Sequence, residues 1–526
     1  MPTSPPPTIH DPSPSASTSA AIRPSLLELL RSRNLAEHRR PWPRFVVDRS
    51  LWQTAGSILA EGSGSLLALW GEPDRIHLSF WEPAHEEAGM ISLPCPEGRF
   101  PSIGRMHPPA LRLERAIHDL FGLMAEESPD PRPWLDHGAW DIRFPLGKTT
   151  PTNGPTPYPF LPAEGEELHQ VPVGPVHAGI IEPGHFRFTA AGETVVRLEE
   201  RLGYVHRGIE RMLCGAEIEH AAKLAARVSG DTTAAYSSAF ARAVEAALGI
   251  EAPPVAHWLR ALCIEIERVA NHLGDVGAIC NDAAFPRMQA FCAILREKVL
   301  RAADRCFGHR LMMDQIIPGG IRSVPAPEAL RGFRELAQQI ADSLPEILKV
   351  YETTPSLQDR VAGTGVLSRD LANQYGCGGV IGRASGRPFD ARLHLPYAPY
   401  PSLRFSVAVR EEGDVDARVS IRIREVEQSL GLILQIVDGL PEGTASVPLC
   451  RTEASTGEGL ALVEGFRGDI FAWVRLDEKG RIERCHLRDP SWFQWPLLEA
   501  AIYGNIIADF PLCNKSFNCS YAGHDL

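Results

Sequence analysis

The sequence lacks several features that would assign it to a common class of protein. Its 11 cysteines include no CxxC pair, so neither a zinc ribbon nor a disulfide framework is predicted. No apolar run approaches the roughly 18 residues of a membrane-spanning helix. The N-terminus has no basic start followed by an apolar stretch, so we expect a reducing, cytosolic compartment. The net charge of -12 argues against nucleic acid as a partner, because such proteins need a basic face.

What the sequence has is length and ample apolar content. With 526 residues, 44% of them hydrophobic, the chain is expected to hold more than one domain. Residues 1–24 are rich in Pro, Ser and Thr, and such a segment cannot bury enough apolar surface to order itself. We therefore predict a disordered N-terminal tail, which we extend over residues 1–41.

Residues 42–147 are predicted to form a first domain of mixed α/β type. Strand-like runs cover 44–48, 65–71 and 75–81, and apolar residues at helical spacing predict a helix over 110–123. Residues 148–170 contain five Pro and two Gly, a composition typical of an extended linker. Such a linker would let the first domain dock independently on a partner.

Residues 171–526 are predicted to form a larger domain centred on a helix bundle. Helical periodicity predicts helices over 237–248, 255–276, 288–315, 331–351 and 416–438. Strands are expected within 459–475 and 481–487. The fold class is therefore α+β, with an N-terminal α/β domain followed by a helix-bundle-centred domain that carries small β-sheets.

Long motifs in both parts resemble a known superfamily. VPVGPVHAGIIEPGHFRF (171–188), ARVSGDTTAAYSSAFARAVEAALGIE (226–251) and the C-terminal NIIADFPLCNKSFNCSYAGHDL (505–526) resemble the large, 49 kDa-like subunit of complex I and membrane-bound [NiFe]-hydrogenases, especially the formate hydrogenlyase and hydrogenase-4 branch. ALRLERAIHDLFGL (110–123) is similar to the complex I 30 kDa subunit, although the following loop, Asp136-His137-Gly138, departs from that family's Gly-His-Pro. A 30 kDa-like domain fused ahead of a 49 kDa-like one is a known arrangement.

The resemblance implies a nickel–iron site whose ligands are absent. In hydrogenases of this superfamily two cysteine pairs hold the metals, and the corresponding positions here are Ser229, Thr232, Ser520 and Gly523. Hydroxyl groups ionise far too reluctantly to replace thiolates, and glycine has no side chain. Cys519 lies one residue out of register. We therefore expect no nickel and no cofactor bound by this chain itself.

Four further residues are candidates, each with a plainer alternative. Glu210 matches a magnesium-ligand position, or is a structural carboxylate paired with a buried Arg. Arg467 would donate to a polar group in the cavity, or is an ordinary turn residue. His177 matches a quinone-binding histidine, or is a satisfied loop residue. Asp231, within SGDTT, would relay protons or bind a hard cation, or belongs to a helix N-cap.

We therefore expect an oxidoreductase subunit of the NADH dehydrogenase and hydrogenase superfamily. Electrons would pass from an iron–sulfur cluster of a partner subunit to a quinone or another acceptor. The alternatives are a non-catalytic coupling scaffold of an ion-translocating complex and a [NiFe]-hydrogenase with unrecognised ligands. The resemblance implies a small Fe–S subunit, a ferredoxin-like subunit and antiporter-like membrane subunits as partners. It also implies a peripheral location on the cytoplasmic face of the inner membrane.

Overall fold

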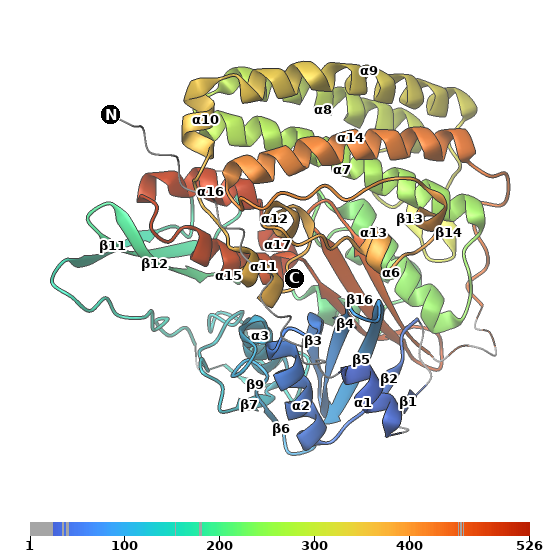
Figure 1. Cartoon of the computed structure of the whole chain (residues 1–526). Helices are drawn as coiled ribbons and strands as arrows, with labels where there is room; N and C mark the ends of the chain where they lie inside the picture. Colours follow the sequence, from blue (N-terminus) through green and yellow to red (C-terminus); the bar gives the residue numbers. More distant parts are fainter. Residues whose placement is uncertain are drawn as a thin grey trace, which may run out of the picture.

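Figure 1 shows the computed structural model of the chain, which describes residues 25–33, 36–37, 41–152, 154–177, 181–450, 452, 455 and 457–526. A twisted sheet built by the N-terminal part lies below a layer of long helices, and C-terminal strands and helices lie between the two. The predicted α+β class is confirmed. No helix in the described part of the chain is long and apolar enough to cross a membrane.

The N-terminal sheet has the strand order β1-β2-β5-β4-β3, in which only β2 and β5 run parallel. Its strands and the elements around it are β1 (Ala36–Glu37), β2 (Arg44–Val46), α2 (Arg49–Ala60), β3 (Ser65–Glu72), β4 (Arg75–Glu82), β5 (Glu87–Pro94), β6 (Arg99–Pro101), α3 (Leu111–Phe121) and β7 (Met124–Glu126). The predicted strands near 44–48, 65–71 and 75–81 and the predicted helix over 110–123 are therefore present.

Strand β3 is buried along its whole length because both of its faces are covered. Leu66 and Leu69 pack in the same apolar core as Ile117 of α3. Leu67 and Trp70 pack on the other side, in a cluster that contains Trp473 of the C-terminal sheet. The first domain is thus held against the second by an apolar face.

A short helix corrects the predicted disordered tail. Helix α1 (Leu26–Ser32) begins after Ser25, whose Oγ accepts a hydrogen bond of 3.1 Å from Glu28 N. Leu26, Leu27 and Leu30 of this helix are buried. The prediction of disorder over 1–41 is therefore wrong for this helix, and residues 1–24, 34–35 and 38–40 of that range lie outside the described residues.

The segment 148–170 is not a free linker. Its start forms β9 (Thr150–Pro151) with β8 (Ile142–Arg143), and its end enters β10 (Leu168–Val173). Between them, Pro159 O accepts a hydrogen bond of 2.9 Å from Arg132 Nη1, and Leu161 N donates to Glu199 Oε2 at 2.9 Å. The expectation that the first domain docks independently is wrong, because this segment is anchored and the two parts share a core.

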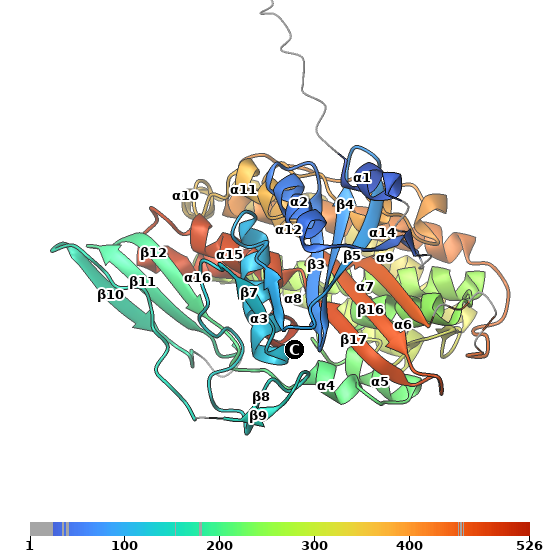
Figure 2. The ribbon, with the colours of Figure 1, turned by 90° about the horizontal axis from the view of Figure 1, so that it is seen from below.

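The second part joins a projecting sheet, a helix bundle and a buried sheet. Strands β10, β11 (His185–Ala191) and β12 (Thr194–Arg201) project from the body (Figure 2). The long helices are α6 (Thr233–Leu248), α7 (Pro254–Asp282), α8 (Pro286–Phe307), α9 (Pro327–Glu352) and α14 (Val415–Gly439). The buried sheet is β15 (Glu458–Glu464), β16 (Asp469–Leu476) and β17 (Ile482–Arg488), with α6 against it.

Shorter elements complete the chain. They are α4 (Ile209–Leu213), α5 (Ile218–Ala225), β13 (Ile316–Ile317), β14 (Gly320–Ile321), α10 (Pro355–Val361), α11 (Arg369–Gln374), α12 (Gly379–Ala384), α13 (Ala391–His394), α15 (Ser491–Ala501), α16 (Phe510–Phe517) and α17 (Tyr521–Asp525). All five predicted helices of this part are present, but α8 ends at Phe307 rather than near residue 315. Gly308, with φ 70°, terminates it in the left-handed conformation that glycine adopts readily.

Candidate functional site

The four positions that correspond to metal-binding cysteines lie close together. Ser229 precedes α6 and Thr232 is its N-terminal boundary residue, whereas Ser520 precedes α17 and Gly523 lies within it. Ser229 Oγ is 3.3 Å from Ser520 Oγ, and Gly523 N donates to Ser520 Oγ at 2.8 Å. The fold thus brings two segments 291 residues apart in sequence to one site, here called the hydroxyl site.

An ion pair lies beside these hydroxyl groups. Arg467, in the turn between β15 and β16, donates from Nη1 and Nη2 to the two carboxylate oxygens of Asp231 at 2.8 and 2.7 Å. Its Nη1 also donates to Thr232 Oγ1 at 2.9 Å, and its Nε donates to Asn518 O at 2.6 Å. Ser229 and Thr232 donate to Asp231 Oδ1 at 2.7 and 2.8 Å.

These contacts decide the charge of Asp231. Burial by itself raises the pKa of Asp231, but the Arg467 guanidinium and the two hydroxyl donors hold this pKa well below its ordinary value. The carboxylate is therefore ionised and bound on both oxygens. Sequence reasoning named both residues, and the structure pairs them with each other.

A second carboxylate occupies the space beside Gly523. A Cβ atom at this position would lie closer than 3.0 Å to Asp489 Oδ2 and to Ser520 Oγ. Asp489 is fully buried and held in place, because Tyr236 Oη donates to its Oδ2 at 2.6 Å and Ser491 N donates to its Oδ1 at 2.9 Å. There is consequently no room for a cysteine side chain at residue 523 in this arrangement. Sequence reasoning missed Asp489.

The start of α6 is capped from another helix. Ala234 N and Ala235 N donate to the carboxylate of Glu267 on α7 at 2.6 and 3.2 Å. Thr232 stands at the cap position, but its side chain makes no capping hydrogen bond. The hypothesis that the SGDTT segment supplies the cap is therefore wrong, since its Asp231 binds Arg467 instead. Burial raises the pKa of Glu267 to about 8.

Glu210 lies on α4, apart from the contacts just described. Its Oε1 is 2.7 Å from His486 Nδ1 and accepts a hydrogen bond of 3.3 Å from Leu487 N. Burial raises the pKa of Glu210, but nearby His486 and Arg484 bring it below its ordinary value. Within the described ranges no group of three or more His, Cys, Asp or Glu side chains is placed to hold a metal ion. Glu210 has a histidine as its hydrogen-bonding partner rather than the predicted arginine.

His177 lies on the loop after β10. Its Nε2 is 2.7 Å from Gly184 O, and the ring is half-buried. The same loop is anchored to α17, because Ala522 N donates to Glu182 Oε2 at 3.0 Å. Among the described residues, His177 makes no hydrogen bond to the hydroxyl site. The loop nonetheless runs beside α17, since Gly184 lies against Tyr521.

The residues present do not fit a nickel–iron centre. The side chains at the hydroxyl site offer hydroxyl oxygens and a carboxylate already bound to arginine. Cys519 is adjacent to Ser520, but it is buried and burial raises the pKa of its thiol well above the ordinary value. Low-valent nickel and iron require several thiolates, so this donor set is chemically unsuited to them.

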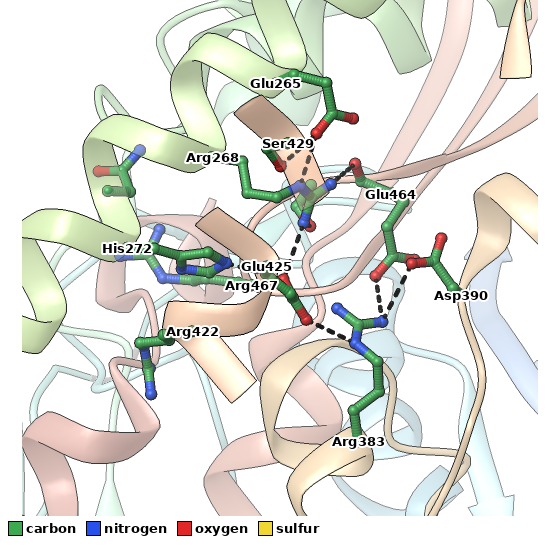
Figure 3. Close-up of polar contacts among 12 residues, drawn as sticks. Glu265, Arg268, His272, Arg383, Asp390, Arg422, Glu425, Ser429, Glu464 and Arg467 are labelled. Atoms are coloured by element: carbon green, nitrogen blue, oxygen red, sulfur yellow. Dashed lines mark hydrogen bonds and ion pairs between the residues drawn. The ribbon is translucent and has the colours of Figure 1, made fainter. Parts of the chain in front are cut away.

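A buried network of charges lies near Arg467 (Figure 3). Glu425 of α14 accepts from Arg383 Nε at 2.7 Å, and its Oε2 is 2.8 Å from His272 Nε2. Arg383 Nη1 also donates to Glu464 at 2.9 Å. These side chains are all fully or almost fully buried, and their charges are compensated within the protein interior.

The network extends toward the hydroxyl site through Asn518. The Asn518 residue accepts from Arg467 at its backbone carbonyl and donates from Nδ2 to both oxygens of Asp275 at 2.9 Å. Asp275 also pairs with Arg422 Nε at 3.2 Å. Arg467 is therefore fixed from two sides, by Asp231 and by the chain segment that leads to Ser520.

Comparison with known proteins supports the family resemblance that the sequence motifs indicated. Residues 283–453 match the model of the respiratory-chain NADH dehydrogenase 49 kDa subunit, and residues 75–156 match that of the 30 kDa subunit. Formate hydrogenlyase subunit 5 of Escherichia coli is 31% identical over 439 residues, which cover 81% of this chain and 77% of that protein. The C/D fusion protein of the NADH-quinone oxidoreductase of Bacteroides thetaiotaomicron is 28% identical over 417 residues, covering 74% and 78%.

A solved structure shows the same likeness. A chain of the membrane-bound sulfane sulfur reductase, an archaeal respiratory membrane complex, is 28% identical, with a TM-score of 0.64, over 69% of this chain and 99% of that one. These matches bear out the resemblance in both parts of the sequence. The chain belongs to the family of 49 kDa-type oxidoreductase subunits shared by NADH-quinone oxidoreductase and formate hydrogenlyase, and it carries a 30 kDa-type domain in the same polypeptide.

Proposed function

We propose that this chain is the large subunit of a membrane-associated, complex I-like oxidoreductase that works without nickel. Electrons would pass from an iron–sulfur cluster of a partner subunit to a quinone or another acceptor. The observation that carries the proposal is the bidentate Asp231–Arg467 pair beside Ser229, Thr232 and Ser520, where relatives with cysteines would hold metal. The oxygen donors favour hydrogen-bonding chemistry over metal binding.

The side chains at the hydroxyl site suit a polar acceptor more than a metal. Reducing a quinone adds protons, which require donors within hydrogen-bond reach. Asp231 is a poor donor, because its pKa is held low and it stays ionised. The candidate proton donor is therefore the imidazole of His177, and the Ser520 hydroxyl is a candidate hydrogen-bond donor to the acceptor, since the Ser229 hydroxyl already donates to Asp231. We assign Arg467 to hold Asp231 in place beside the hydroxyl groups and to compensate its charge.

The partners and the location are part of the same proposal. We infer contact with a small Fe–S subunit, a ferredoxin-like subunit and antiporter-like membrane subunits, and a peripheral position on the cytoplasmic face of the inner membrane. Support comes from the formate hydrogenlyase and membrane-bound sulfane sulfur reductase likenesses. The likeness to the sulfane sulfur reductase also adds sulfane sulfur to quinone as a candidate class of acceptor.

The test uses the assembled complex purified with its partners. We expect it to reduce a quinone or polysulfide with a chemical reductant, and to show no hydrogen uptake with a dye acceptor. Arg467→Gln should lower acceptor reduction strongly, whereas Arg334→Gln, at an exposed ion pair with Asp438, should leave it unchanged. Hydrogen uptake at hydrogenase rates would contradict the proposal, as would equal acceptor reduction in both variants.

A second candidate is a non-catalytic coupling scaffold for ion-translocating subunits. It is favoured by one observation, that Asp489 takes up the space beside Gly523 instead of leaving it open. The scaffold predicts that a quinone analogue does not bind and that Arg467→Gln leaves acceptor reduction unchanged. Saturable binding of the analogue that is lost in Arg467→Gln would exclude it.

A further inference from the structure

A cavity of about 540 Å³ lies between α6, the start of α7 and the N-terminal domain. Its lining includes Trp42, Arg242, His257, Tyr397 and Leu460, and none of the hydroxyl-site residues. It therefore forms a separate place where the two parts of the chain meet. Figure 2 shows α6 and β16 side by side in this part of the molecule.

Arg242 gives this cavity a positive charge. Its Nε is buried without a hydrogen-bond partner, although the side chain as a whole is only partly buried. The guanidinium lies 4.6 Å above the centre of the Tyr397 ring. A buried guanidinium nitrogen without an acceptor is unusual, because it has given up its hydration without replacement.

The nearest carboxylate cannot neutralise this arginine. Glu245 is already bound by Arg260, whose Nη1 and Nη2 lie 3.0 and 2.5 Å from its two oxygens. Its Oε1 also accepts a hydrogen bond of 2.7 Å from Gly319 N. Another lining carboxylate, Glu251, is exposed to solvent. Neither lining carboxylate therefore pairs with Arg242, whose guanidinium is left to solvent or to a ligand in the cavity.

The imidazole of His257 also lines this cavity. His257, on the first turn of α7, has a buried Nδ1 without a partner. Burial lowers the pKa of His257 to about 4, helped by the positive charges of Arg260 and Arg242, so the imidazole is neutral, and its hydrogen bond with the Ala252 backbone uses its single N–H. The amino end of a 29-residue helix adds partial positive charge here.

We propose that this cavity binds a small organic anion, whose carboxylate or phosphate group is held by Arg242 while an apolar or aromatic body lies against Tyr397 and Trp42. The planar guanidinium matches either oxyanion in a two-pronged geometry. The aromatic and aliphatic walls suit a flat, apolar body, as in most small-molecule sites. The buried Nε of Arg242 and a guanidinium charge without a carboxylate partner point to this occupant.

The test measures binding to the full-length chain within its complex by titration calorimetry and thermal shift. The probes are benzoate, phenyl phosphate, inorganic phosphate and the neutral benzamide. We expect benzoate or phenyl phosphate to bind and raise the melting temperature, and benzamide to bind at least about tenfold more weakly because it lacks the charge. The relative affinities of the first two probes distinguish a carboxylate from a phosphate ligand.

Variants separate the site from general charge effects. Arg242→Gln should weaken anion binding by roughly tenfold or more, and Arg242→Lys should retain part of it. Arg334→Gln removes an exposed arginine elsewhere and should bind like the unmodified chain. Unchanged binding in a folded Arg242→Gln variant, or no binding of either organic anion, would overturn the proposal. Inorganic phosphate binding as tightly as phenyl phosphate would overturn the role given to the aromatic walls.

Discussion

Gly523→Ala tests whether the hydroxyl site is filled by its own side chains. The added Cβ would lie closer than 3.0 Å to Asp489 Oδ2, so the carboxylate must move. Moving it breaks the hydrogen bonds that it accepts from Tyr236 at 2.6 Å and Ser491 N at 2.9 Å. A buried polar group left without its partner costs about 1–3 kcal/mol, so two such losses with partial relaxation predict a destabilisation of about 2–4 kcal/mol.

Urea unfolding followed by circular dichroism measures this difference in the free energy of unfolding. A matched control is Gly230→Ala in the same site, where an added Cβ meets no atom within 4 Å. That variant should differ from the unmodified chain by no more than about 0.5 kcal/mol. Combining Gly523→Ala with Asp489→Ala should cost less than the sum of the two single changes, because the clash is then absent. Equal stability of the Gly523→Ala and Gly230→Ala variants would refute the reasoning.

Two further changes concern buried carboxylates. Glu425→Gln should lower the free energy of unfolding by about 3–5 kcal/mol, because it leaves buried cations without their counter-charge. The control Asp438→Asn, at an exposed ion pair, should lower it by less than about 1 kcal/mol. Equal losses in the two variants on urea unfolding would contradict this prediction. Burial raises the pKa of Glu267 from 4.5 to about 8, so the folded chain retains a proton that the unfolded chain releases, and stability should fall as pH rises through this interval. The Glu267→Gln variant cannot ionise at this position, so its stability should fall less with rising pH. An unchanged pH profile of the melting temperature in this variant would contradict the raised pKa of Glu267.

The long helices could be predicted because periodic apolar residues mark their buried faces. The stripe on α7 was visible from Leu259 to Leu273, and the structure extends this helix to Pro254–Asp282. The end of α8 was missed although Gly308 signals it. Helix α1 was missed because the Pro- and Ser-rich composition of the first residues outweighed a short run that begins at Ser25.

The candidate site could be predicted only as a set of positions. The resemblance supplied Ser229 and Ser520, but no local pattern tells that Arg467 would bind Asp231, 236 residues away. Asp489 lies in the connection between β17 and α15, and its position beside Gly523 depends on how this connection packs against α17. Such tertiary packing cannot be read from a local sequence pattern. The same holds for Glu267, whose role as a cap arises from the packing of α7 against α6.

The nickel content of the purified, assembled complex tests the central claim most directly. Elemental analysis by inductively coupled plasma mass spectrometry would be run on material grown with added nickel, beside a nickel-containing hydrogenase prepared in the same way. The account predicts iron from the partner's clusters but no stoichiometric nickel, because Ser229, Thr232 and Ser520 offer hydroxyl groups and Gly523 no side chain at all. One nickel per chain would contradict it.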